Sequence, residues 1–252
     1  MTEEARAELD IGSDWTRRWT AVWKYTGQKI TSTVHGLVSM PARGCEPVRA
    51  FNFSFAQPSR AGVEFLLSTG RRHGYESLEE LMLLHALDFA GDLDEVQSQP
   101  MRLRFSTTSG QQEHIPDYLA YTAAGMVLFD VRPAALIRDK DRVKFAAAAE
   151  VAFALGWRYA VVAGWRPHVV ANLSEMRARY RPMTDPLGMS DQVLAQLRSV
   201  PRRFDEIVEA TSVPAIARTH LTHLLWHRRA VIDMSQPLGD ASLVWAAGVG
   251  SC

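Results

Sequence analysis

Two aspartates, Asp117 and Asp130, lie on strand-like runs that flank the small-residue turn TAAG in the stretch HIPDYLAYTAAGMVLFDVRP. The alternating pattern and the turn predict a β-hairpin. If Tyr121 faces Met126, Asp117 lies opposite Asp130 with Cβ atoms ~5 Å apart, where two like charges are destabilising. A bound cation would relieve this repulsion, and Mg²⁺ or Mn²⁺ prefers carboxylate oxygens.

A divalent metal at this hairpin would suit phosphodiester hydrolysis, because it lowers the pKa of bound water and neutralises charge in the transition state. Arg132 follows Asp130 by two residues, so it lies on the same strand face and could add positive charge there. Two other interpretations stay open. The aspartates could be solvated surface residues, or a register shift of one could send one of them to the opposite face.

The composition favours a globular chain without a strong overall charge. The 252 residues are 47% hydrophobic, and 28 basic residues balance 28 acidic ones. Overall charge therefore provides no attraction to nucleic acid, and any DNA affinity has to come from local patches. Cys45 and Cys252 show no disulfide or zinc spacing, and no apolar run reaches the ~20 residues of a membrane span. We expect a soluble cytoplasmic protein.

The segments around the hairpin predict a mixed α/β core with helices on one face. The stretch DWTRRWTAVWKYTGQKITSTV is ambiguous between helix and hairpin, its second half favours a hairpin, and its tryptophans are expected to pack inside. YESLEELMLLHALDF predicts a helix with Ser77 as N-cap and Glu80 in capping-box position. VQSQPMRLRFS predicts one strand, TTSGQQE a turn, RDKDRVKFAAAAEVAFALGW an alanine-rich helix and RYAVVAGW a buried strand.

Beyond Pro182 the sequence pattern changes to short helical segments that have Pro or Ser at their starts. MSDQVLAQLRSV, PRRFDEIVEAT and VPAIARTHLTHLLWHRR predict three short helices, and AVIDMSQPLGDASLVW predicts two strands around a turn. Three helices followed by a β-ribbon are typical of a winged helix. The domains expected are residues 1–50 as a β-rich extension packing on the core, 51–180 as the core and 181–252 as the winged helix.

These motifs, taken in order, resemble a known family. The Pro-Asp hairpin with Asp130 and Arg132 resembles the Pro-Asp, (Asp/Glu)-x-Lys signature of restriction-endonuclease-like nucleases. GYESLEELMLLHALDF, SQPMRLRF, the hairpin and FAAAAEVAFALGWRYAVV are similar, in order and spacing, to the TnsA-like endonuclease subunits of bacterial heteromeric transposases. The resemblance covers about residues 49–162, and the winged-helix pattern agrees with the appended domain of that family.

The resemblance implies a Mg²⁺-dependent endonuclease, with Mn²⁺ as a substitute, whose metal ligands are Asp117, Asp130 and Glu80. Glu79 is the rival of Glu80, because a helix boundary shifted by one residue would exchange the two. Glu80 also has a structural interpretation as the capping partner of Ser77. Gln99, in a Gln-Pro pair that the family shares, could bind a metal-bound water or satisfy the backbone at a strand end.

Arg132 departs from the family, which has lysine at this position. Arginine stays protonated, so it cannot act as a base, although it can hold a phosphate oxygen. Water activation would then depend on the metal. Lys140 or Lys144 on the following helix could supply an ammonium group instead, or the activity could be lost.

The histidines of the C-terminal helix leave three interpretations open. His220, His223 and His227 have a spacing that can hold zinc, but a solvated polar helix side is favoured. In the third interpretation the helix faces DNA or a partner, with phosphate contacts from Arg218, Arg228 and Arg229.

The resemblance implies double-stranded DNA, an integrase-like transposase subunit and a regulatory ATPase as partners. The enzyme would cut the non-transferred strand at transposon ends. The alternatives are a defence or repair nuclease of the same fold and a non-catalytic DNA-binding or adaptor subunit with a degenerate site.

Overall fold

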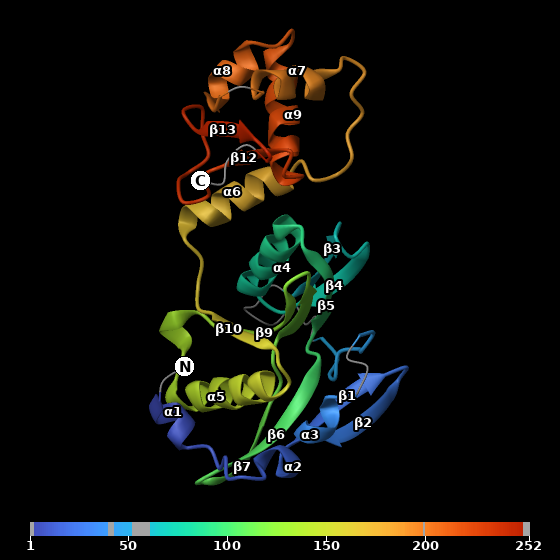
Figure 1. The fold of residues 1–252 in the computed structure, drawn as a ribbon, viewed down its shortest axis with the longest axis vertical. Helices are drawn as coiled ribbons and strands as arrows, with labels where there is room; N and C mark the ends of the chain where they lie inside the picture. Colours follow the sequence, from blue (N-terminus) through green and yellow to red (C-terminus); the bar gives the residue numbers. More distant parts are fainter. Residues whose placement is uncertain (1–2, 40–42, 52–60, 199, 249–252) are drawn as a thin grey trace. The chain divides into compact units, whose positions relative to one another are not determined.

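The chain consists of two units in the computed structural model, which describes residues 3–39, 43–51, 61–198 and 200–248 (Figure 1). The units are Met1–Gly164 and Trp165–Cys252, and each contains helices and strands. The protein is therefore mixed α/β, as predicted, with several separate sheets. Among the helices in the described ranges, none combines the length and apolar character needed to cross a membrane.

The boundary between the units lies after Gly164, earlier than the predicted end of the core at residue 180. Helix α6 (Pro167–Arg177) belongs to the second unit, where the Asn172 side chain forms hydrogen bonds with the backbone of residues 236–238. The Asn172 amide nitrogen donates to the Gln236 carbonyl at 2.8 Å, and its amide oxygen accepts from the Leu238 N–H at 2.8 Å.

The described helices and strands of the first unit follow one another along the chain. The helices are α1 (Glu3–Ala7), α2 (Trp15–Arg18), α3 (Val34–Leu37), α4 (Leu78–Ala90), the 3₁₀ helix η1 (Ala134–Leu136) and α5 (Asp139–Ala154). The strands are β1 (Thr20–Tyr25), β2 (Gln28–Thr33), β3 (Gly62–Leu66), β4 (Arg71–Tyr75), β5 (Leu93–Ser98), β6 (Met101–Thr107), β7 (Gly110–His114), β8 (Tyr118–Thr122), β9 (Gly125–Val131) and β10 (Arg158–Val162).

The predicted hairpin forms the centre of a four-stranded sheet with the order β10-β9-β8-β5. Tyr121 pairs with Met126, as expected, and Tyr118 pairs with Phe129. The turn is shorter than predicted, because Thr122 also pairs with Gly125, whose φ of 104° suits glycine. Strand β10 runs parallel to β9, and β5 runs antiparallel to β8.

Helices cover both faces of this sheet, whereas the sequence predicted helices on one face. Helix α5 packs on the face that presents Leu119 and Leu128, and all three belong to one buried cluster (Figure 1). Tyr118 alternates with Leu119 and reaches Glu80 of α4 on the opposite face. The alanines Ala146 to Ala149 are fully buried, so their small side chains let α5 approach the strands closely.

A second four-stranded sheet has the order β2-β1-β6-β7 and joins the N-terminal hairpin to the core. The predicted hairpin in the second half of the ambiguous stretch is confirmed, since β1 pairs with β2. The same stretch begins with the short helix α2. Trp19 and Trp23 are buried, which confirms their packing role, and Trp15 lies edge-on to Trp19 with ring centroids 4.7 Å apart.

The single strand predicted for VQSQPMRLRFS is wrong, because the chain bends at Gln99 and Pro100 and passes from one sheet to the other. Strand β5 ends at Ser98, and β6 begins at Met101. Gln99 has φ 48°, a left-handed conformation that is uncommon outside glycine. The predicted turn TTSGQQE is also shorter, because β7 already begins at Gly110.

The second unit has helices and a small sheet in alternation. Its further elements are α7 (Met189–Gln196), β11 (Arg202–Arg203), α8 (Phe204–Glu209), α9 (Pro214–Trp226), β12 (Ala230–Ile232) and β13 (Leu243–Ala246). The sheet order is β11-β13-β12, all antiparallel. The three predicted helices and the β-ribbon after residue 182 are therefore present.

Candidate functional site

Asp117 stands at the entry to β8 and is fixed by its backbone on both sides. Its N–H donates to the Phe129 carbonyl at 3.0 Å, and its own carbonyl accepts from the Gln99 N–H at 2.7 Å. One carboxylate oxygen, Oδ2, accepts from the Val131 N–H at 2.6 Å. Burial, followed by the charges of Asp130 and Glu80, raises the pKa of Asp117 well above its usual range. The repulsion predicted from the hairpin is therefore present.

Glu80 lies in the first turn of α4, where it is 9% exposed. Ser77 caps the helix as predicted, because its Oγ accepts from the Glu80 N–H at 3.1 Å and donates to Glu80 Oε1 at 3.0 Å. Glu80 Oε2 accepts from the Glu76 N–H at 2.8 Å and from the Tyr118 hydroxyl at 3.3 Å. Glu80 therefore has its capping role and also lies close enough to act on Asp117.

Burial raises the pKa of the Glu80 carboxyl, although the hydrogen bonds from Glu76 and Ser77 oppose this effect. Glu79, the rival in the sequence interpretation, is half-buried, whereas Glu80 is among the main charges that raise the pKa of Asp117. The geometry therefore favours Glu80 over Glu79.

Asp130 is 1% exposed, and protein groups hold both of its oxygens. Oδ1 lies 2.8 Å from His114 Nε2, and Oδ2 accepts from the Tyr159 hydroxyl at 2.6 Å. Burial and the charge of Asp130 raise the pKa of Tyr159 far above its usual range, so this hydroxyl stays protonated. Each Asp130 oxygen therefore already has a protein partner, and a bound metal would share this carboxylate with His114 and Tyr159.

His114 and Tyr159 are the site residues that sequence reasoning missed. His114 opens the hairpin stretch, and Tyr159 lies on the parallel neighbour of β9, in register with Leu128. The sequence signal was a histidine and a tyrosine on strands next to an aspartate. Their convergence depends on the parallel pairing of β10, which local patterns do not specify.

Arg132 is partly exposed, and its guanidinium contacts lie around the start of α5. Its Nε donates to the Leu136 carbonyl at 3.4 Å and lies 3.8 Å from Asp141 Oδ2. Of the two lysines proposed as substitutes, Lys140 is exposed on α5 and Lys144 is half-buried there. These contacts of Arg132 are thus with Leu136 and Asp141 and do not include Asp117.

Gln99 lies directly beside Asp117, because the pairing of β5 with β8 continues past Ser98 and Tyr118. Its backbone is satisfied by Asp117 and by Val48, whose N–H donates to the Gln99 carbonyl at 3.1 Å. The side chain is 3% exposed, and its Oε1 is buried with no hydrogen-bond partner in the part of the chain described. A buried amide oxygen without a partner is costly and indicates a missing donor or ion.

The donors around Asp117 fit a hard divalent cation only in part. Among the described residues, no three side chains of the types His, Cys, Asp or Glu are arranged to hold a metal ion, so the predicted three-carboxylate shell is not assembled. Glu80 and Asp117 nevertheless repel each other in a buried setting, and the Gln99 amide oxygen has no partner. Carboxylate and amide oxygens are the ligands that Mg²⁺ and Mn²⁺ take.

No protein-family model and no curated protein sequence matches this chain. The function is therefore inferred from the residues described above and from the arrangement of the elements that carry them.

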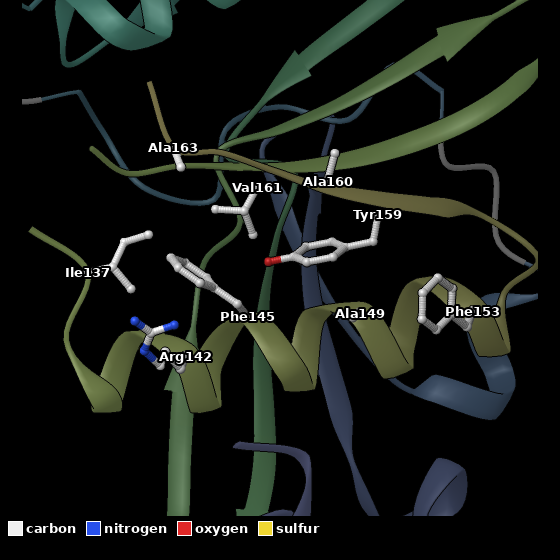
Figure 2. A pocket seen from close by; sticks show the side chains of 9 residues that line it. All are labelled: Ile137, Arg142, Phe145, Ala149, Phe153, Tyr159, Ala160, Val161 and Ala163. Atoms are coloured by element: carbon white, nitrogen blue, oxygen red, sulfur yellow. The ribbon is translucent and has the colours of Figure 1, made fainter. Parts of the chain in front are cut away.

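A cavity of about 430 Å³ lies between α5 and β10. Figure 2 shows Phe145 of α5 and Tyr159 of β10 pointing into the space between helix and strand. The other labelled residues are mostly apolar, with Arg142 as the one charged side chain among them. No carboxylate is among the residues that line this cavity, so we do not assign the metal site to it.

The histidines of α9 are held by protein groups rather than solvated. His220 is 3% exposed, and its Nδ1 lies 3.0 Å from Ser190 Oγ. His223 and His227 contact the carbonyls of Arg179 and Tyr180 at 2.6 Å and 2.9 Å. The favoured interpretation as a solvated polar side therefore does not describe His220, and the described residues contain no zinc cluster.

The three arginines predicted to contact DNA or a partner differ in availability. Arg218 forms an ion pair with Asp240 at 2.6 Å and stacks on Phe204. Arg228 and Arg229 are exposed just after the end of α9. The structure therefore separates Arg218 from the other two.

Proposed function

We propose that this chain is a metal-dependent DNA endonuclease with a restriction-endonuclease-like core and a C-terminal winged-helix domain, similar to the TnsA-like subunits of heteromeric transposases. The observation that carries the proposal is the meeting of Glu80 and Asp117. Burial, and then the charges of Asp130 and Glu80, raise the pKa of Asp117, and the buried amide oxygen of the neighbouring Gln99 has no hydrogen-bond partner among the described residues. Perturbed, buried carboxylates are typical of functional sites.

The order of the elements supports the fold that the proposal names. Helix α4, strand β6, the hairpin of β8 and β9, helix α5 and strand β10 follow the order in which the family resemblance places their motifs, with β5 and β7 between them. The second unit supports a winged helix, because α7, α8 and α9 come before a β-ribbon that β11 completes as a third strand.

Each residue then has a limited role in the reaction. Glu80 and Asp117 would hold Mg²⁺, and the Gln99 amide oxygen would be the third protein ligand. When bound, the metal supplies a water of lowered pKa and neutralises charge on the phosphate. Arg132 cannot act as a base, and its partly exposed guanidinium would hold a phosphate oxygen of the DNA. The integrase-like transposase and the regulatory ATPase remain partners that the resemblance alone implies.

A second candidate function is a non-catalytic DNA-binding or adaptor subunit. It is favoured by Asp130, whose two oxygens are both hydrogen-bonded, and by Arg132, which stands where the family has lysine. In this case the carboxylates at Asp117 would be a remnant of a lost site.

Plasmid cleavage separates the two candidates. In Mg²⁺ or Mn²⁺ the endonuclease should nick supercoiled DNA, and Asp117→Asn or Glu80→Gln should slow it by about a hundredfold or more, since a metal ligand contributes several kcal/mol. Asp92→Asn, at an exposed site outside the cluster, is the matched control. DNA binding without cleavage by the wild type would favour the adaptor, and Asp130→Asn at wild-type rate would exclude Asp130 as a ligand.

A further inference from the structure

The segment that follows α6 is fastened to the C-terminal end of α9. His223 Nδ1 lies 2.6 Å from the Arg179 carbonyl, and His227 Nε2 lies 2.9 Å from the Tyr180 carbonyl. A carbonyl oxygen can only accept, so each of these ring nitrogens carries a proton and donates. The two histidines therefore position the backbone of Arg179 and Tyr180 on the helix.

Aromatic stacking fixes the same segment from its other side. The Arg177 guanidinium lies 3.8 Å from the ring centroid of Tyr180 and 5.1 Å from that of Trp226. Arg181 lies 5.7 Å from the Tyr180 ring, and its Nε donates to the Tyr180 hydroxyl at 3.3 Å. Arg179 and Arg181 are thus held beside α9, and both remain exposed.

Two more arginines lie just beyond the C-terminal end of α9. Arg228 and Arg229 follow directly after the helix, and both are exposed. Arg228 has φ 56°, and this left-handed conformation follows the end of the helix. We call Arg179, Arg181, Arg228 and Arg229 the arginine cluster, because His223 and His227 join the two segments that carry them.

Three other arginines of the second unit have carboxylate partners. Arg203 pairs with Asp205 at 2.8 Å, and Arg202 lies 3.9 Å from Glu206. Arg218, the residue expected from sequence to contact DNA, pairs with Asp240. In contrast, none of the carboxylates in the described ranges pairs with Arg179, Arg181 or Arg229. Arg179, Arg181 and Arg229 are therefore a local excess of positive charge on a chain whose formal net charge is zero.

We propose that the arginine cluster binds the phosphate backbone of double-stranded DNA. The identification of the bound polyanion as DNA rests on the proposed function. The observed excess of positive charge is independent of that function. Guanidinium groups hold phosphate oxygens bidentately and release counterions when they do so. The contact is thus assigned to the C-terminal end of α9, whereas Arg218 in the middle of that helix is engaged with Asp240.

Fluorescence anisotropy of the full chain with a short labelled duplex, in EDTA so that no cleavage occurs, tests this proposal. The test variant is Arg179→Gln/Arg229→Gln, and the matched control is Arg202→Gln/Arg203→Gln, which removes the same charge from paired positions. We expect the test variant to bind about tenfold or more weakly and to lower the salt slope by about two between about 50 and 200 mM salt. The control should bind like the wild type.

Four results would overturn the proposal: normal binding by the test variant, no binding by the wild type, equal loss in the control variant, or tighter binding of a single-stranded RNA of the same length. Failure here is distinguishable from failure of the proposed function, because plasmid cleavage depends on Glu80 and Asp117 and is measured separately. If the test variant binds DNA normally and the wild type still cleaves plasmid, the arginine cluster is not the DNA contact, whereas the proposed nuclease activity stands.

Discussion

Asp117 is the residue where the requirements of folding and of the proposed chemistry conflict. Its carboxylate is surrounded by Glu80 and Asp130 and receives one backbone hydrogen bond, from Val131. Folded proteins keep such unfavourable groups mainly at functional sites. The conflict predicts a gain in stability when the charge is removed.

Asp117→Asn should raise the melting temperature of the metal-free protein at neutral pH. The pKa of Asp117 is raised on folding, so its charged form opposes folding, and stability falls as the pH rises from the unfolded pKa toward the folded one. The gain from the variant should therefore be absent at about pH 3, below the ordinary aspartate pKa, and grow as the pH increases. Thermal unfolding in EDTA across this range measures it, with Asp92→Asn as the control; an equal gain at every pH would contradict it.

Tyr159 should contribute to stability through Asp130. Tyr159→Phe removes the 2.6 Å hydrogen bond to a buried carboxylate and should cost about 1–3 kcal/mol in urea unfolding. Tyr121→Phe is a matched control, because the buried Tyr121 hydroxyl has no hydrogen-bond partner in the described part of the chain. Equal costs for the two variants would show that the Asp130 contact adds nothing.

At the level of the elements, the sequence predicted what short-range patterns determine. The small-residue turn and the alternating strands specified the register of β8 and β9, so the pairing from Tyr121 and Met126 to Tyr118 and Phe129 could be predicted. The bend at Gln99 could not, because it needs a non-glycine residue in a left-handed conformation. The contacts of Asp130 with His114 and Tyr159 could not be predicted either, since they depend on how β7 and β10 lie beside the hairpin.

Helix α5 tolerates little added volume at its fully buried alanines. Ala147→Leu should cost about 1–3 kcal/mol, because this side chain is fully buried in close packing. Ala154→Leu, at the exposed end of the same helix, should stay within about 0.5 kcal/mol of the wild type. Urea unfolding of both variants measures the difference, and a neutral Ala147→Leu would mean that α5 packs more loosely than described.

At the level of the whole molecule, the two units are joined by a segment without regular structure, residues 163–166. Ala163 and Gly164 are exposed there. Exposed irregular segments are preferred sites of proteolysis. Brief digestion with elastase, which cleaves after small residues, should yield two resistant fragments near the sizes of the units. Mass spectrometry identifies the cut, and initial cleavage inside α5 or α9 would contradict the division.

Titration of the full chain with Mn²⁺ by calorimetry tests the metal site most directly. The wild type should bind the metal, Asp117→Ala should lose binding, and Gln99→Ala should weaken it by about tenfold, in the range of residues that support metal ligands. Asp92→Asn, at an exposed carboxylate outside the cluster, is the control and should bind like the wild type. If the wild type binds no Mn²⁺, the proposal of a metal-dependent endonuclease is contradicted and the non-catalytic adaptor function is favoured.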